Sequence, residues 1–318
     1  MRFRFLRVAI TALGSAHAAS LDLAAMPHAV RQGVVETPGI IYATYNGYRP
    51  LDLTIYRPEH AAAALPIVVV VHGGGWFQDP FKPVAGTPPD PNAPAAETDA
   101  TLWRLAARGY VVASVSYRLS SEAKFPAQID DVRQAVRFLR AHAADMDGDP
   151  AHILAWGSSA GGYLVTLLGA SCHGADCVQA VVAWYAPIDF SLLDAEAARD
   201  HLPPGGNSVR HDAPNSPESR LLGCALPVCS ADLLKQANPL MYLTAAAPPF
   251  LIVQGLADRA VPWQQAQILA DALKRAGVPA TLHLVSGADH MFQGISKTES
   301  DQLTQETFDW IDRVSGKR

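Results

Sequence analysis

The residue best placed for covalent chemistry is Ser159, in the run Gly157-Ser158-Ser159-Ala160-Gly161. This run fits the pattern Gly-x-Ser-x-Gly, in which a sharp strand-to-helix turn exposes the serine hydroxyl. The two glycines of the pattern leave room for the helix to pack closely on the strand. A serine hydroxyl is a weak nucleophile unless a base removes its proton and a third group orients that base. Ser159 is therefore a candidate nucleophile if a base and an acid are found elsewhere.

Two residues further along the chain could complete this set. Asp258 and His290 each end a short glycine-containing stretch that follows an apolar run. We interpret His290 as the base and Asp258 as the acid that orients it. Asp189 and Asp289 are alternative acids, but Asp189 is better interpreted as a loop-capping or pocket-wall residue, and Asp258 leads straight into a predicted helix.

A glycine-rich stretch upstream could supply hydrogen-bond donors to a developing oxyanion. His72-Gly73-Gly74-Gly75 follows an apolar run, and glycines let backbone amides approach a substrate that a side chain would obstruct. A flexible loop is the alternative interpretation of three glycines. Because of the preceding run, we expect the amides of Gly74, Gly75 and Ala160 to form an oxyanion hole.

The hydrophobic pattern predicts the elements that must position these residues. Unbroken aliphatic runs, as at 65–71, are typical of strands buried on both faces of a parallel sheet, and 34–58 carries the signature of an antiparallel hairpin. Helical periodicity is predicted at 101–108 and starts again at Pro126. Strands then alternate with helices: strands at 110–117, 153–156, 178–185, 250–254 and 281–285, and helices at 160–168, 263–276 and 300–314.

This alternation predicts an α/β fold with a mainly parallel central sheet and helices on both faces. The chain order Ser159, Asp258, His290, each after its own strand, is that of the α/β-hydrolase fold. We expect one domain over residues 19–318, with a small cap or lid excursion and loop or lid segments at about 78–98 and 192–237.

Several motifs together resemble the hormone-sensitive-lipase-like esterases, in particular the bacterial bifunctional feruloyl and acetylxylan (BD-FAE type) esterases. They are His72-Gly73-Gly74-Gly75-Trp76, Tyr117-Arg118-Leu119, Phe125 to Asp131 and Trp156 to Gly162. The resemblance implies a carboxylesterase that hydrolyses small acyl or aryl esters, including acetyl or feruloyl esters of plant polysaccharide. It also implies that no metal or organic cofactor takes part.

The sequence departs from the family pattern at Ser120-Ser121-Glu122, where many relatives have Ala-Pro before the glutamate. We expect this stretch and the long 78–98 segment to border the pocket. Two alternative functions stay open: amide hydrolysis by the same residues, as in an arylformamidase or small peptidase, and ligand binding without catalysis.

Composition narrows the class of partner. The chain has 318 residues, with 25 basic and 30 acidic side chains and a formal net charge of −5. Because the basic residues are scattered, we expect no nucleic-acid partner, and the partner is a small-molecule or polysaccharide-linked ester. No long apolar run predicts a membrane span in the mature chain, and the oligomeric state is left open.

The N-terminus and the cysteines indicate export. Residues 1–18 combine a basic start, a short apolar stretch and Ala16-His17-Ala18, as in a signal peptide, so a periplasmic or secreted location is expected; a frayed basic terminus is the alternative. Cys172 and Cys177, and Cys224 and Cys229, have equal spacing and favour two local disulfides. Reduced thiols are the alternative, and the spacing disfavours a metal site.

Overall fold

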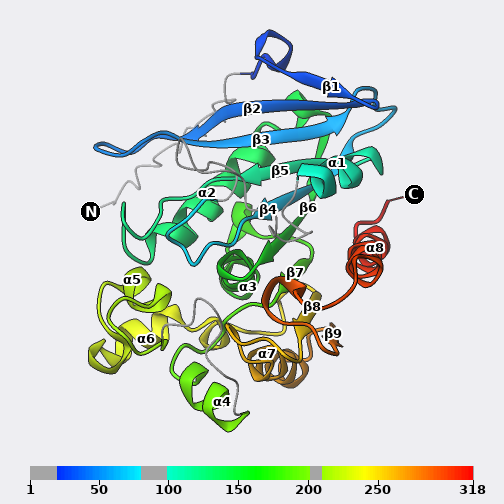
Figure 1. Cartoon of the computed structure of the whole chain (residues 1–318). Coiled ribbons are helices and arrows are strands. Elements are labelled where there is room, and N and C mark those ends of the chain that lie inside the picture. Colours follow the sequence, from blue (N-terminus) through cyan, green and yellow to red (C-terminus); the bar gives the residue numbers. More distant parts are fainter. Residues whose placement is uncertain (1–19, 80–98, 201–209, 318) are drawn as a thin grey trace, which may run out of the picture.

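The computed structural model describes residues 20–79, 99–200 and 210–317. Its centre is a nine-stranded sheet in the order β1-β2-β3-β5-β4-β6-β7-β8-β9 (Figure 1). The first four strands in this order pair antiparallel, and all later pairs are parallel. The strands are β1 (Ala29–Arg31), β2 (Val34–Ala43), β3 (Leu51–Pro58), β4 (Leu65–Val71), β5 (Val111–Val115), β6 (Gly148–Ser158), β7 (Val181–Trp184), β8 (Phe250–Gly255) and β9 (Ala280–Val285).

Helices cover both faces of this sheet (Figure 1). One face packs against α1 (Asp99–Ala107) and α8 (Lys297–Val314), and the other against α2 (Ala127–Ala141), α3 (Ala160–Ser171) and α7 (Gln264–Arg275). In β4, the side chains of Ile67, Val69 and Val71 enter one core, and those of Val68 and Val70 enter the other. This double burial explains the unbroken aliphatic run, and the predicted α/β-hydrolase fold class is confirmed.

The remaining described helices are short. Three follow β7 in the chain: α4 (Leu193–Arg199), α5 (Pro217–Leu222) and α6 (Ala231–Ala237). The 3-10 helices are η1 (Leu23–Ala25), η2 (Ala143–Met146), η3 (Gly174–Asp176), η4 (Leu226–Val228), η5 (Pro239–Met241) and η6 (His290–Phe292).

Two features of the secondary structure were not predicted. The segment 192–237, expected as a loop or lid excursion, contains the short helices α4, α5 and α6. These helices have only six or seven residues, too few for a periodic apolar pattern, although Ser216 and Ser230 cap two of them. Strand β1 was not predicted, because its three residues are all exposed. Most of 78–98 and all of 1–18 lie outside the described residues.

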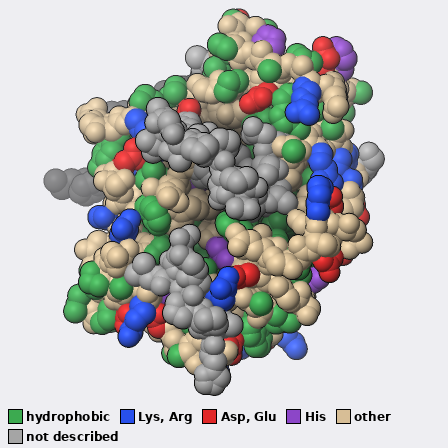
Figure 2. All heavy atoms as spheres, in the orientation of Figure 1, with side chains coloured by type: hydrophobic (Ala, Val, Ile, Leu, Met, Phe, Trp, Pro, Cys, Tyr) green, Lys and Arg blue, Asp and Glu red, His purple; other side chains and the backbone are tan. Residues whose placement is uncertain are grey.

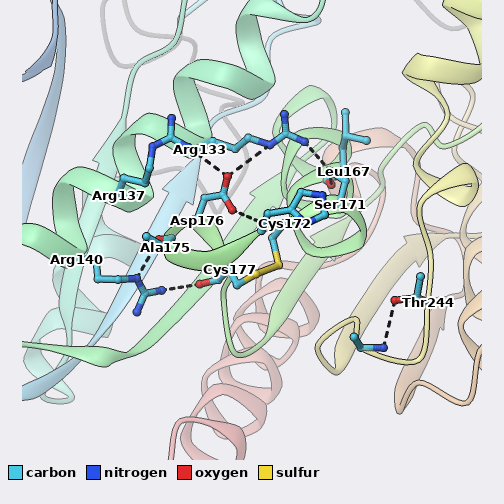
Figure 3. The surroundings of a disulfide bond; sticks show 12 residues. Arg133, Arg137, Arg140, Leu167, Ser171, Cys172, Ala175, Asp176, Cys177 and Thr244 are labelled. Carbon is cyan, nitrogen blue, oxygen red and sulfur yellow. Dashed lines mark hydrogen bonds and ion pairs between the residues drawn. A yellow bond between two sulfur atoms is a disulfide. The ribbon is translucent and has the colours of Figure 1, made fainter. Parts of the chain in front are cut away.

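The cysteines pair locally, as predicted. Disulfides join Cys172 to Cys177 and Cys224 to Cys229, with Cα–Cα distances of 4.8 and 5.4 Å. Figure 3 shows three arginines of α2 that hold the first disulfide loop: Arg133 bonds Ser171, Arg137 bonds Asp176, and Arg140 bonds backbone carbonyls of the loop. Among the described residues, none of the helices is long and apolar enough to cross a membrane.

Candidate active site

Ser159 occupies a strained turn between β6 and α3. Its φ is +51°, a value that non-glycine residues rarely adopt, and its amide donates a hydrogen bond to the carbonyl of Trp184 at 2.9 Å. The two glycines of the motif are required by close contacts. A side chain at Gly157 would collide with the backbone of Gly161, and one at Gly161 would collide with the backbone of Val71. The backbone is thus held in the conformation that exposes the Ser159 hydroxyl.

The structure brings the three residues predicted as a catalytic set into one hydrogen-bonded chain. Nε2 of His290 lies 3.0 Å from Oγ of Ser159, and Nδ1 of His290 lies 2.9 Å from Oδ2 of Asp258. Asp258 follows β8 and His290 follows β9, while Ser159 follows β6. All three strands are parallel, so their carboxyl ends meet at one edge of the sheet.

Asp258 is fixed by four hydrogen bonds. Its Oδ1 accepts from the amides of Ala260 and Val261 at 2.9 and 2.8 Å, and its Oδ2 accepts from Nε2 of Gln254 at 2.9 Å as well as from His290. The Asp258 side chain is fully buried. Gln254 lies on β8 and is 0% exposed. It was not identified from the sequence, because the sequence does not distinguish a polar strand residue that supports the site from one that does not.

The pKa of His290 is raised above its usual value by its surroundings. Burial acts against the charged imidazolium, but the negative charge and hydrogen bond of Asp258 outweigh it. A partly buried base that faces a carboxylate is suited to accept a proton and to carry the positive charge that results.

The two alternative acids lie elsewhere. Asp289 accepts hydrogen bonds from the amides of Arg259 and His290 and pairs with the Arg259 side chain. Asp189 bonds Nδ2 of Asn238 at 2.9 Å and lines a different cavity, beside α6. Neither carboxylate contacts the His290 ring through a hydrogen bond in the described structure.

The glycine loop after β4 turns sharply at Gly74 and Gly75. Gly74 and Gly75 have φ values of +98° and +58°, and the Gly74 carbonyl accepts from the amides of Phe77 and Gln78 at 3.1 and 3.0 Å. The amides of Gly74 and Gly75 donate to no group in the described part of the chain. Ala160 begins α3, where the helix dipole favours negative charge.

Ser159, His290, the glycine loop and the start of α3 border one cavity of about 520 Å³, which we call the Ser159 cavity. Its wall consists of the glycine loop, the Ser159 turn, the end of β7, the loops after β8 and β9, and α5 with the segment before it. Trp76 lines it, but Ser120-Ser121-Glu122 does not, contrary to expectation. Glu122 instead pairs with Arg49 and accepts from the Leu119 amide.

Charged side chains are mixed on the outer surface. Figure 2 shows Lys and Arg side chains interspersed with Asp and Glu on the face drawn there. In the described segments, no group of three His, Cys, Asp or Glu side chains is arranged to hold a metal ion.

Comparison with known proteins identifies the family. The BD-FAE family model matches residues 53–273, a span that includes the glycine loop, Ser159 and Asp258. The chain belongs to the BD-FAE family. His290 lies beyond the matched span, so its assignment depends on its hydrogen bonds to Ser159 and Asp258.

The relatives of this BD-FAE chain are esterases. It is 27% identical to "Esterase LipQ" of Mycobacterium tuberculosis over 94% of this chain and 67% of that protein. It is 29% identical to "Esterase LipC" of the same organism over 74% of this chain, but only 55% of that protein. A solved structure titled "Truncated form of carbohydrate esterase from gut microbiota" has 25% identity and a TM-score of 0.69, covering 89% of this chain and 96% of that one. Family and relatives together support a carboxylesterase.

Proposed function

We propose that this BD-FAE chain hydrolyses carboxylic esters through an acyl-enzyme on Ser159. As Oγ attacks the ester carbon, Nε2 of His290 takes its proton, and Asp258 stabilises the imidazolium. His290 then gives this proton to the oxygen of the leaving alcohol. Water next transfers a proton to His290 and attacks the acyl carbon, and Ser159 leaves with its proton restored.

The observation that carries the proposal is the chain of hydrogen bonds from Ser159 through His290 to Asp258 at the wall of an open cavity. In the same proposal, the amides of Gly74, Gly75 and Ala160 hold the oxyanion of the tetrahedral intermediate. Three convergent backbone donors stabilise charge that exists only during reaction, and the loss of one such donor costs roughly 10²–10³-fold in rate.

We propose acetyl or feruloyl esters of plant polysaccharide, and small esters of the same acids, as the substrates. The size of the cavity, about 520 Å³, suits a small acyl or aryl group with part of an alcohol. Membership of the BD-FAE family supports this substrate class. The solved relative titled a carbohydrate esterase supports it as well.

We further propose that the enzyme acts in the periplasm or outside the cell. Its two disulfides support an oxidising compartment. Mass spectrometry of the protein expressed with residues 1–18 would test this: cleavage after Ala18 supports export, and an intact N-terminus in the cytoplasm contradicts it.

The test of the mechanism compares wild type, Ser159→Ala, His290→Gln and the matched control Ser121→Ala. Ser121 is exposed and lies outside the cavity. The substrates are p-nitrophenyl acetate, a long-chain p-nitrophenyl ester, methyl ferulate, acetylated xylan and N-formylkynurenine. We expect wild type and the control to release acid from short or feruloyl esters. In the two site variants we expect kcat/KM for these esters to fall by at least about 10³-fold.

Other outcomes contradict the proposal in distinct ways. Activity on N-formylkynurenine alone would make the enzyme an arylformamidase. A folded wild-type protein that is inert on the whole panel would favour a binding role. Ester hydrolysis at the wild-type rate by folded Ser159→Ala would rule out the serine mechanism.

A further inference from the structure

Helix α5 brings charged side chains to the Ser159 cavity. The helix begins at Pro217, whose side chain packs so closely on the glycine loop that a Cβ at Gly75 would lie 3.3 Å from its Cβ. Glu218 and Arg220 of this helix line the cavity, as does His211 in the segment before it. The part of the cavity wall formed by α5 and the segment before it is therefore polar and charged.

Two of these side chains face each other. Nδ1 of His211 lies 3.1 Å from Oε1 of Glu218, and their side chains are only 14% and 4% exposed. The carboxylate of Asp194 fixes the backbone here, because it accepts from the amides of His211 and Asp212 at 2.9 and 2.8 Å. Burial opposes protonation of His211, but Glu218 outweighs it and raises the pKa of His211. The Glu218 carboxylate therefore faces His211 rather than Arg220.

Arg220 contacts an aromatic ring instead. The central carbon of its guanidinium lies 5.0 Å from the centroid of the Phe77 ring, a cation–π contact that holds the group at the wall. Phe77 lines the same cavity. Among the described residues, no carboxylate pairs with Arg220, whereas Arg210 nearby in sequence pairs with Asp212. The five donors of the Arg220 guanidinium are thus available to a ligand.

Among the described residues, Arg220 is the charged group of the cavity wall that has no opposite charge beside it. His211 and Glu218 face each other, and His290 faces Asp258. The chain as a whole has a formal net charge of −5, so the Arg220 cation is opposite in sign to the overall charge. Arg220 is an exposed residue, so its charge can meet a substrate that enters the cavity.

We propose that Arg220 is a specificity residue that selects esters carrying a carboxylate in addition to the scissile ester. The planar guanidinium fork matches a carboxylate through two parallel hydrogen bonds. Phe77 fixes the fork from one side, and the His211–Glu218 pair adds a further polar contact at the same wall. This inference rests on the proposed ester hydrolysis and narrows its substrate class.

The test uses matched pairs of charged and neutral esters. For a carboxylate on the acyl side, mono-p-nitrophenyl succinate is compared with p-nitrophenyl 4-oxopentanoate. For a carboxylate on the alcohol side, 4-acetoxybenzoate is compared with 4-acetoxybenzamide. The ratio of kcat/KM within each pair measures the preference for negative charge, and the pair that shows it identifies the side of the ester that Arg220 contacts.

The variants are Arg220→Met, Arg220→Lys and the control Arg210→Met, which removes a paired and exposed arginine outside the cavity. We expect wild type to prefer the charged ester of one pair. Arg220→Met lowers the charged-to-neutral ratio of kcat/KM about tenfold, mainly through a higher KM for the charged ester. Arg220→Lys keeps part of the preference for the charged ester, and Arg210→Met keeps all of it. Raising ionic strength from about 0.05 to 0.5 M lowers the wild-type ratio but not that of Arg220→Met.

An unchanged ratio in Arg220→Met, in a protein that still hydrolyses the neutral esters, would overturn the inference and leave the esterase proposal intact. A preference of wild type for both neutral esters would overturn it too. Failure of wild type to hydrolyse any of the four esters would instead count against the proposed function.

Discussion

Nε2 of His290 lies 3.0 Å from Oγ of Ser159, although 131 positions separate the two residues in the chain. Their strands β6 and β9 are not neighbours, because β7 and β8 lie between them. Parallel pairing across all four strands places each following loop at the same sheet edge. The pair is therefore held by the sheet, and a substitution that leaves the sheet intact acts on the chemistry alone.

The first prediction concerns Asp258→Asn and the pH dependence of kcat/KM. In wild type, neutral His290 is the base, so activity is lost as pH falls through its pKa, which Asp258 raises. Removing the negative charge lowers that pKa, so the acid limb of the pH profile moves to lower pH. The rate at the plateau falls on the order of 10³–10⁴-fold, since an amide no longer stabilises the imidazolium.

Asp189→Asn is the control for this prediction, because Asp189 lies in a different cavity and bonds Asn238. Both profiles are measured with one p-nitrophenyl ester over the pH range in which the protein stays folded. An acid limb that moves in Asp189→Asn but stays in place in Asp258→Asn would reverse the assignment of the acid.

The second prediction is that Gly161→Ala destabilises the fold. A methyl group at this position would meet the backbone of Val71 and His72, and this end of β4 cannot move without disturbing the sheet. We expect the free energy of unfolding to fall by about 3 kcal/mol or more. Urea unfolding followed by circular dichroism measures it, and a wild-type midpoint for the variant would contradict the packing argument.

The positions of Ser159, Asp258 and His290 could be predicted because each follows an apolar run that forms a strand of the parallel sheet. The residues of the pocket wall could not be predicted from the sequence. His211, Glu218 and Arg220 belong to a segment whose helix α5 has six residues, and its position depends on Pro217 packing against Gly75. Such contacts between distant segments leave no periodic pattern in the sequence, and the same holds for Gln254 behind Asp258.

The third prediction concerns the Cys172–Cys177 disulfide. The loop closes over a sequence separation of only 5, so the chain entropy that it removes from the unfolded state is small. The double variant Cys172→Ser/Cys177→Ser should lose about 2 kcal/mol of stability, while the arginines of α2 keep the loop in place. Thermal unfolding with and without reductant measures this, and a loss much larger than that would show that the disulfide does more than close the loop.

The fourth prediction concerns the buried ion pair between Arg118 and Asp131, whose side chains are 12% and 0% exposed. The Asp131 carboxylate accepts hydrogen bonds from Nη2 of Arg118 at 2.7 Å and from the backbone amide of Arg118 at 2.9 Å. These bonds join the segment after β5 to α2. Asp131→Asn leaves a largely buried guanidinium without its counter-charge, and breaking such a pair costs roughly 3–5 kcal/mol. Asp212→Asn, which breaks an exposed pair with Arg210, should change stability by less than about 1 kcal/mol. Equal denaturation midpoints for the two variants would show that burial does not set the strength of the Arg118–Asp131 pair.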